Sequence, residues 1–151
     1  MAGTSTPIFP QTVKNWFAQL INATNAYTLP TGSSTSTTNL VSLIAGDTNG
    51  DKVESINVTS TDTSARDLVL VLITASNTFI LGVVSIPATA GTVNNIVSVD
   101  ILRNAQIPSL SYDSNGNKYL YVASGSTLYV GTLTQVTTNK TVDVTAQGGQ
   151  F

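Results

Sequence analysis

From residue 40 onwards, hydrophobic and polar residues follow the patterns of short β-strands. Residues 52–59 alternate cleanly, with Ile56 and Val58 on one face and polar side chains on the other, as expected of a strand that is buried on one side. Residues 67–74 are continuously apolar and rich in β-branched side chains. Such a run is typical of a central strand that is covered on both faces.

The remaining apolar runs are short, and turn residues separate them. Asp113-Ser-Asn-Gly-Asn117 is a strong turn signal between two such runs. Residues 96–101 predict a strand with Val97, Val99 and Ile101 inward, and residues 102–107 predict one helical turn. The other expected strands are residues 40–44, 79–86, 119–123, 128–133 and 141–146.

Apolar runs that recur at intervals of roughly ten residues are typical of β-sandwiches and jelly rolls. We therefore expect an all-β fold, with a single β-sandwich or jelly-roll-like domain of about eight or nine strands over residues 40–151, including a short C-terminal tail. The spacing does not separate these topologies. A chain of 151 residues is large enough to bury a core without crosslinks.

Residues 1–39 break this pattern and predict an extended N-terminal arm followed by a Ser/Thr-rich loop. Pro7 and Pro10 flank an Ile-Phe pair, which favours an extended backbone. The run Thr31-Gly-Ser-Ser-Thr-Ser-Thr-Thr38 has the low complexity of a linker or exposed loop. Between them, residues 15–21 are apolar and fit a short strand or a helical turn, of which the strand is favoured.

Charged residues are scarce, at 9% of the chain against roughly 25% in an average soluble protein. The net charge is −2 and the six basic residues are scattered, whereas phosphate binding needs clustered Lys and Arg. No stretch approaches the roughly 18 apolar residues of a membrane helix, and the first residues lack the features of a signal peptide. We expect no nucleic-acid or membrane partner, and a neutral surface that is suited to being covered by protein.

The chain contains no His and no Cys, so the commonest general base and the thiol nucleophile are missing. A carboxylate pair would be the main hydrolytic alternative, and no spacing supports a Ser–Lys pair. Most of the acids fall in expected turns or at strand edges, where solvated residues are the simpler interpretation: Asp47, Asp51, Asp62, Asp67 and Asp113. We expect no enzyme, no catalytic residue and no cofactor.

Asp47-Thr-Asn-Gly-Asp51 is the segment that most resembles a metal-binding loop. Its D-x-N-x-D spacing places oxygen atoms on alternate residues, as a hard cation such as calcium prefers. The Gly and Glu that complete a helix–loop–helix calcium loop are replaced by Lys52 and Val58. A turn between strands is the favoured interpretation, because turns use the same residue types, and a weak cation site is the alternative.

Aromatic residues gather late in the chain, at Tyr112, Tyr119, Tyr121 and Tyr129. Tyr119 and Tyr121 share a strand face, and Tyr129 is expected to lie across from them. Cross-strand packing is the favoured interpretation, and an exposed platform for carbohydrate or protein is the alternative.

Large apolar residues near the two ends of the chain are the candidate protein-binding residues. In a leading arm such side chains require a groove, on the same domain or on a neighbour. The Gln147-Gly-Gly-Gln-Phe151 tail repeats this arrangement, with a glycine pair before one aromatic residue. The candidate anchors are Ile8, Phe9, Trp16, Phe17 and Phe151.

Five segments resemble small virion proteins of tailed bacteriophages. They are Thr6-Pro-Ile-Phe-Pro-Gln-Thr-Val13, Val53-Glu-Ser-Ile-Asn-Val-Thr-Ser-Thr-Asp-Thr-Ser-Ala-Arg-Asp67, Asp100-Ile-Leu-Arg103, Asp113-Ser-Asn-Gly-Asn-Lys-Tyr-Leu-Tyr121 and Val144-Thr-Ala-Gln-Gly-Gly-Gln-Phe151. The resemblance spans most of the chain apart from the Ser/Thr run.

The resemblance implies a phage structural protein and, within that class, a capsid decoration (cement) protein. Such proteins are small and β-rich, commonly sit as trimers on the assembled shell, and join neighbouring capsomers through arms. It therefore implies the major capsid protein and further copies of this chain, as a homotrimer, as partners. The implied location is the outer surface of the capsid, after synthesis in the host cytoplasm.

Two other classes of function stay open. The first is a tail, fibre or receptor-binding component that recognises the host surface, for which the Tyr group would form the contact. The second, less favoured, is a small hydrolase or sugar-binding domain.

Overall fold

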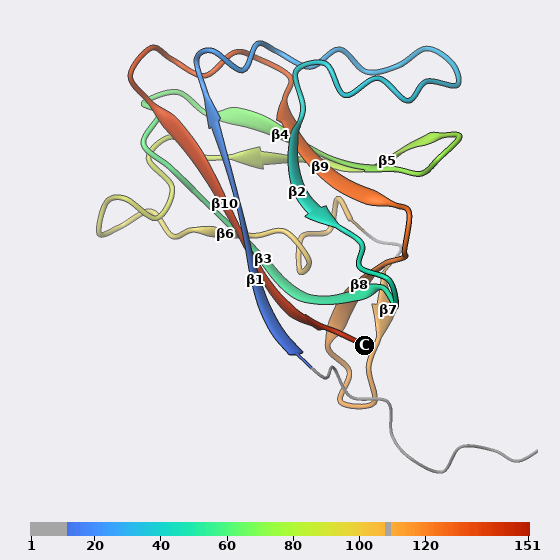
Figure 1. Cartoon of the computed structure of the whole chain (residues 1–151). Coiled ribbons are helices and arrows are strands. Elements are labelled where there is room, and N and C mark those ends of the chain that lie inside the picture. Colours follow the sequence, from blue (N-terminus) through green and yellow to red (C-terminus); the bar gives the residue numbers. More distant parts are fainter. Residues whose placement is uncertain (1–11, 108–109) are drawn as a thin grey trace, which may run out of the picture.

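In the computed structural model, which describes residues 12–107 and 110–151, antiparallel strands form two sheets that pack face to face (Figure 1). The first sheet runs in the order β1 (Thr12–Ile21), β10 (Thr141–Gln150), β3 (Asp51–Ser60), β8 (Lys118–Val122) and β7 (Ser111–Tyr112), and β6 (Val99–Asp100) also pairs with β3. The second sheet runs β2 (Val41–Ala45), β9 (Thr127–Thr132), β4 (Arg66–Ile73) and β5 (Thr78–Ile86).

This architecture confirms the expected all-β sandwich. The described residues form ten strands rather than the eight or nine expected, whereas the jelly-roll topology stays a prediction. The same residues contain no helix, and so none that is long and apolar enough to cross a membrane.

The core lies between the two sheets, where the inward-facing residues of each strand meet. Its largest fully buried side chains include Leu20 and Ile56 from the first sheet, and Ile44, Leu70 and Leu128 from the second. Strand β3 shows the predicted alternation, since Ile56 and Val58 are buried while Asn57 between them is exposed.

Strand β4 is covered on both faces, as its continuous apolar sequence predicts. Leu68 and Leu70 join the main core, whereas Val69, Val71 and Ile73 belong to a second cluster on the opposite face. Tyr27 and Leu40, from the connection between β1 and β2, contribute to this second cluster. The segment that contains the Ser/Thr run therefore carries two apolar side chains that help to cover the outer face of the second sheet.

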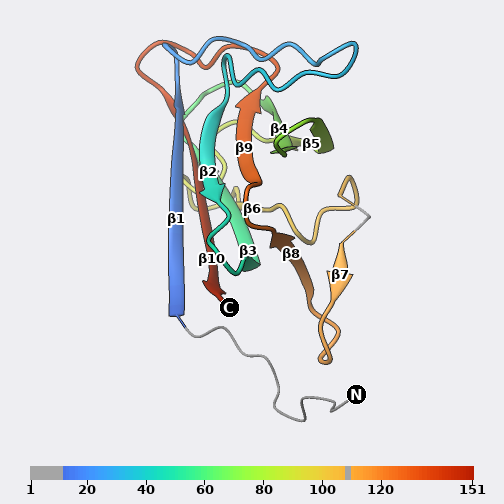
Figure 2. The same ribbon diagram turned by 45° about the vertical axis from the view of Figure 1, so that its right-hand side comes forward.

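The expected boundary at residue 39 does not separate an arm from the sandwich. Strand β1 pairs with β10 over its full length, from Thr12 with Gln150 to Ile21 with Thr141. Figure 2 shows β1 as the outermost strand of its sheet. The strand favoured for residues 15–21 is thus confirmed and longer than expected, and the part of the arm that precedes it lies outside the described residues.

The prediction for residues 96–107 is wrong in two respects. Only Val99 and Asp100 form a strand, and Val97 is 82% exposed rather than inward. The residues before that point form a turn instead of a strand, in which the Gly91 N–H donates to the Ile96 carbonyl. Residues 102–107 form consecutive turns, not a helical turn.

The expected C-terminal tail is the second half of β10. This half lies between β1 and β3, and its register with β3 shifts between Gln147 and Gly148. A Cβ atom on Gly148 would overlap the backbone carbonyl of Lys52. The glycine is therefore required for the close approach of two strands, and it does not mark a flexible linker.

A buried carboxylate joins two of the connections at which the chain passes between the sheets. Asp62, in the β3–β4 connection, is fully buried. It accepts hydrogen bonds from Arg66 Nε at 2.7 Å and from both the N–H and the Oγ1 of Thr137 at 2.9 Å. Thr137 belongs to the β9–β10 connection. Burial alone raises the pKa of Asp62, but the hydrogen bonds from Arg66, Thr137 and Ser64 outweigh it and hold that pKa far below its ordinary value.

We expect Gly148→Ala to lower the free energy of unfolding by about 2 kcal/mol or more, because the added methyl group forces β3 and β10 apart. Urea denaturation measures the change. Gly32→Ala is the matched control, since a Cβ at Gly32 meets no atom within 4 Å. Equal stability of the two variants would contradict the close approach.

We expect Asp62→Asn to destabilise the fold by about 3 kcal/mol, because it leaves Arg66 without its buried carboxylate. In the wild-type protein this stabilisation is complete above the unfolded-state pKa of about 4, and it is lost as the pH falls through the lowered folded-state pKa. The variant's stability should therefore fall less steeply between about pH 4 and pH 2. Asp67→Asn, at an exposed position of β4, is the control in the same denaturation series.

Candidate functional site

The outer face of β1 is the most exposed apolar surface on the first sheet. Along this strand the even-numbered residues from Lys14 to Leu20 turn inward, and the odd-numbered residues turn outward. The outward row contains Val13, Phe17 and Ile21, which are 83%, 72% and 40% exposed. Asn15 and Gln19 lie between them, so the row carries no charge.

Small polar residues continue this face across the neighbouring strands. Phe17 lies opposite Thr145 of β10, and Thr145 lies opposite Asn57 of β3. Asp143 brings a carboxylate to the face, where it accepts a 2.6 Å hydrogen bond from Gln19 Nε2. The result is a firmly paired and weakly charged surface with an apolar row along its edge, which is the composition of a protein-binding face.

The structure separates Trp16 from Phe17, two neighbouring residues that the sequence had suggested as anchors. Phe17 points outward and is free to contact another protein. Trp16 points inward and packs against the main core, because successive residues of a strand face opposite sides. Trp16 is therefore partly buried against its own sandwich, and its role as an anchor for another protein stays a prediction. Ile8 and Phe9 lie outside the described residues.

Phe151 is also engaged within its own domain. Its ring lies 5.9 Å from the ring of Tyr121, and its backbone N–H donates to the Gly50 carbonyl. Asn49 Nδ2 donates to the Phe151 carbonyl, and the Tyr121 hydroxyl donates to the Asn49 carbonyl. These contacts attach residue 151 to the turn at residues 47–50, and they correct the expectation of a free aromatic anchor.

The four tyrosines do not form one platform. Tyr119 and Tyr121 lie on the same face of β8, as expected. Tyr129 lies on β9 in the other sheet, where it packs against the second apolar cluster. Tyr112 and Tyr121 are exposed, so a smaller aromatic surface remains around β7 and β8.

In the Asp47–Asp51 loop, a lysine occupies the place that a cation would take. Lys14 Nζ lies 2.6 Å from Asp47 Oδ2 and 3.3 Å from Asp51 Oδ1, and the Asp47 N–H donates to Asp51 Oδ2. The hydrogen bond from Lys14 lowers the pKa of Asp47, and the same contact raises the pKa of Lys14. Among the described residues, no group of three or more acidic side chains is arranged to hold a metal ion.

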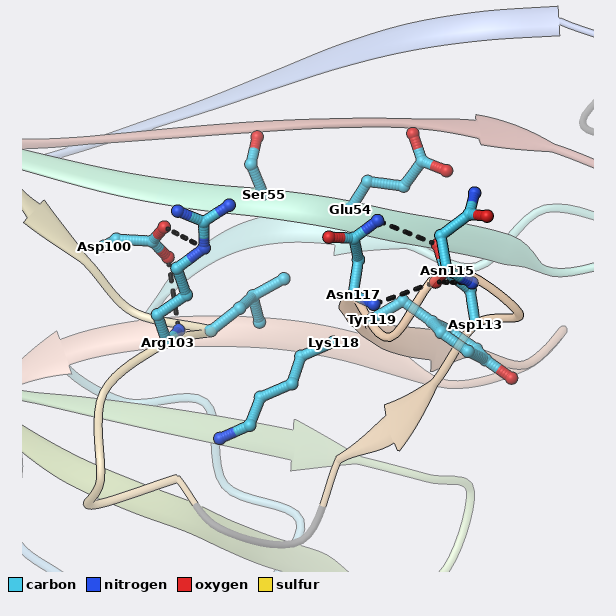
Figure 3. A pocket seen from close by; sticks show the side chains of 10 residues that line it. Glu54, Ser55, Asp100, Arg103, Asp113, Asn115, Asn117, Lys118 and Tyr119 are labelled. Atoms are coloured by element: carbon cyan, nitrogen blue, oxygen red, sulfur yellow. Dashed lines mark hydrogen bonds and ion pairs between the residues drawn. The ribbon is translucent and has the colours of Figure 1, made fainter.

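A polar cleft of about 450 Å³ opens beside the β7–β8 hairpin (Figure 3). Glu54 and Ser55 line one side, and Asp100 and Arg103 lie next to them. Arg103 Nε approaches Asp100 Oδ2 at 3.4 Å. Leu102 adds an apolar side chain, and the hairpin supplies the rest of the lining, namely Asp113, Asn115, Asn117, Lys118 and Tyr119.

The chemistry of this cleft favours a structural role for its acids. Asp113 Oδ1 accepts hydrogen bonds from the Asn115 and Asn117 N–H groups at 2.9 and 2.8 Å, and these bonds lower its pKa. Asp113 therefore stabilises the hairpin turn that its sequence predicts. A general acid requires the opposite direction of pKa shift.

Comparisons with protein-family models, with curated proteins and with solved structures find no match for this chain. The candidate site, the outer face of β1, therefore rests on the geometry of the described residues.

We expect the midpoint of thermal unfolding to be the same in millimolar calcium and in a chelator, because the Lys14 ammonium already neutralises Asp47 and Asp51. Differential scanning calorimetry measures both midpoints. Lys14→Met, which removes the ammonium but keeps much of the aliphatic side chain, should unfold at a lower temperature. A calcium-dependent rise of the wild-type midpoint would contradict this assignment and favour the cation site.

Proposed function

We propose that this protein is a structural component of a phage virion, a capsid decoration (cement) protein that binds the assembled lattice of the major capsid protein. The observation that carries the proposal is the exposed, uncharged row of Val13, Phe17 and Ile21 on the outer face of β1. Apolar surface of this kind on a firmly paired sheet is suited to contact with another protein. The likeness of five segments to phage virion proteins supports the class.

The segment before β1 extends this contact. Residues 6–11 come directly before β1 in the sequence, and we assign Ile8 and Phe9 to the same contact. Apolar side chains that become buried on the capsid offset the conformational entropy that binding removes. Together with Phe17, they form the proposed contact with the major capsid protein.

The mechanism follows from binding equilibria. A subunit that binds the assembled lattice and not the free capsid protein stabilises the lattice by mass action. In this proposal the protein is made in the host cytoplasm, adds to the outer surface of the capsid, and acts as a homotrimer, as the resemblance implies.

A tail, fibre or receptor-binding role is the second candidate. It is favoured by Tyr112 and Tyr121, which are 61% and 47% exposed. They lie on β7 and β8, the two strands of the hairpin that lines the polar cleft of Figure 3. The two roles differ in copy number. A decoration protein is present at a ratio near one to the major capsid protein on a gel of purified virions, whereas a tail protein is present in a few copies.

We expect the double variant Ile8→Ala/Phe9→Ala, and a chain lacking residues 2–11, to lose at least tenfold in affinity for assembled capsids. Both variants keep β1 intact, whereas a deletion through residue 17 would remove half of a paired strand. Co-sedimentation with capsids measures occupancy, and circular dichroism verifies the fold.

Val97→Ala is the control for this experiment, because Val97 is an exposed apolar residue in the β5–β6 connection, outside the proposed contact. It should bind capsids as the wild type does. Unchanged occupancy for the deletion variant would overturn the proposed role of the segment before β1.

A further inference from the structure

The free edge of β1 differs from the other sheet edges that the structure describes. Strand β1 has ten residues and pairs with β10 in unbroken register. By contrast, β2 and β5 each contain a register shift, and β7 has two residues. Bulges and short strands are the usual protection of an edge against further pairing. The β1 edge has neither, so every second residue offers an unpaired N–H and C=O to a partner strand.

The usual inward-pointing charge is present on β1, but it is neutralised. Lys14 is the strand's one charged residue, and its ammonium is bound by Asp47 and Asp51 inside its own domain. It therefore does not oppose the approach of a second strand.

The outward row of β1 is symmetric about Phe17. Reading outward from Phe17 in either direction, the next outward residue is an amide, Asn15 or Gln19, and the one after that is aliphatic, Val13 or Ile21. In an antiparallel pair centred on Phe17, Val13 faces Ile21 of the second copy, Asn15 faces Gln19, and Phe17 faces itself. Apolar residues thus meet apolar residues and amides meet amides, and such cross-strand pairs stabilise a sheet.

The inward row is compatible with the same register. Trp16 faces Ala18 of the second copy, so a large side chain lies opposite a small one, and Lys14 faces Leu20. No pair brings like charges together. A contact in which one patch binds its own copy is the requirement for a closed two-fold dimer.

From these observations we propose that two copies of this protein pair through β1, antiparallel and centred on Phe17, to form a continuous sheet across a two-fold axis. The occupant of the edge is a second copy of the same strand. This inference goes beyond the proposed function, because it concerns the free protein and makes no use of a capsid. For the free protein it expects a two-fold dimer in place of the homotrimer that the resemblance implies for the capsid-bound protein.

Analytical ultracentrifugation of the whole chain tests the proposal. We expect a monomer–dimer equilibrium, which Phe17→Lys weakens at least tenfold because it places two ammonium groups on the two-fold axis. Val97→Lys is the matched control and should leave the equilibrium within about twofold of the wild type. Phe17 is mostly exposed, so the variant should keep its fold, and circular dichroism verifies this.

Disulfide trapping tests the register and keeps Phe17 in place. The chain contains no Cys, so introduced thiols have no competitors. Under mild oxidation, an equimolar mixture of Asn15→Cys and Gln19→Cys should give a disulfide-linked dimer, whereas each variant alone should not. Crosslinking of Asn15→Cys with itself would overturn the proposed register.

Three results of the ultracentrifugation would overturn the dimer. They are a wild-type chain that is monomeric at every concentration, a trimer instead of a dimer, and a chain lacking residues 2–11 that no longer dimerises. The last result would show that residues 2–11, and not the β1 edge, hold the two copies together. Loss of capsid binding by that deletion, with the dimer intact, would instead support both proposals separately.

Discussion

Asp62 lies where the chain passes between the two sheets, and the arrangement of the sandwich depends on its hydrogen bonds. Asp62 belongs to the β3–β4 connection, and it accepts hydrogen bonds from Arg66, the first residue of β4, and from Thr137 in the β9–β10 connection. Because β3 neighbours β10 in one sheet and β4 neighbours β9 in the other, the same carboxylate aligns a pair of strands in each sheet. The position of β10 in turn fixes β1, and with it the exposed row that includes Phe17. The buried Asp62 carboxylate thus helps to fix the position of β1, whose outward row consists of neutral side chains.

The sequence predicted those parts of the fold that have a local cause. Alternation in β3 and continuous burial of β4 follow directly from the side-chain pattern, and Asp113 forms the turn expected of it. The failures have non-local causes. Val97 follows the alternation of a strand, but it comes directly after a turn closed between Gly91 and Ile96, and its side chain is exposed. From the sequence alone, Gly148 could mark a flexible segment or a close approach of two strands. The backbone carbonyl of Lys52, which a Cβ on Gly148 would overlap, shows that it is a close approach.

The candidate surface was predictable in part. If residues 15–21 form a strand, successive side chains point to opposite faces, so Trp16 and Phe17 cannot both face outward. The choice between helix and strand therefore determines whether both aromatic residues or only one can contact a partner. The contacts of Lys14 and Phe151 were beyond such reasoning. Lys14 meets acids more than thirty positions away in the sequence, and Phe151 meets Tyr121, a pairing that no local pattern encodes. Both contacts involve the same turn, residues 47–51, which the sequence presented as an isolated loop.

The pairing of β1 with β10 also has a consequence for the order of events during translation. Gln19 and its hydrogen-bonded partner Asp143 are separated by 124 positions, and β10 emerges from the ribosome after every other strand that the structure describes. Until then β1 has no hydrogen-bonded neighbour strand within the described residues. Strand β3 likewise lacks its longest strand pairing, the one with β10. The β1–β10–β3 part of the first sheet can therefore form only after β10 has been synthesised, and sheets closed by such distant segments fold slowly. In the interval, the nascent chain exposes an apolar strand with two free edges, which makes early chaperone binding advantageous.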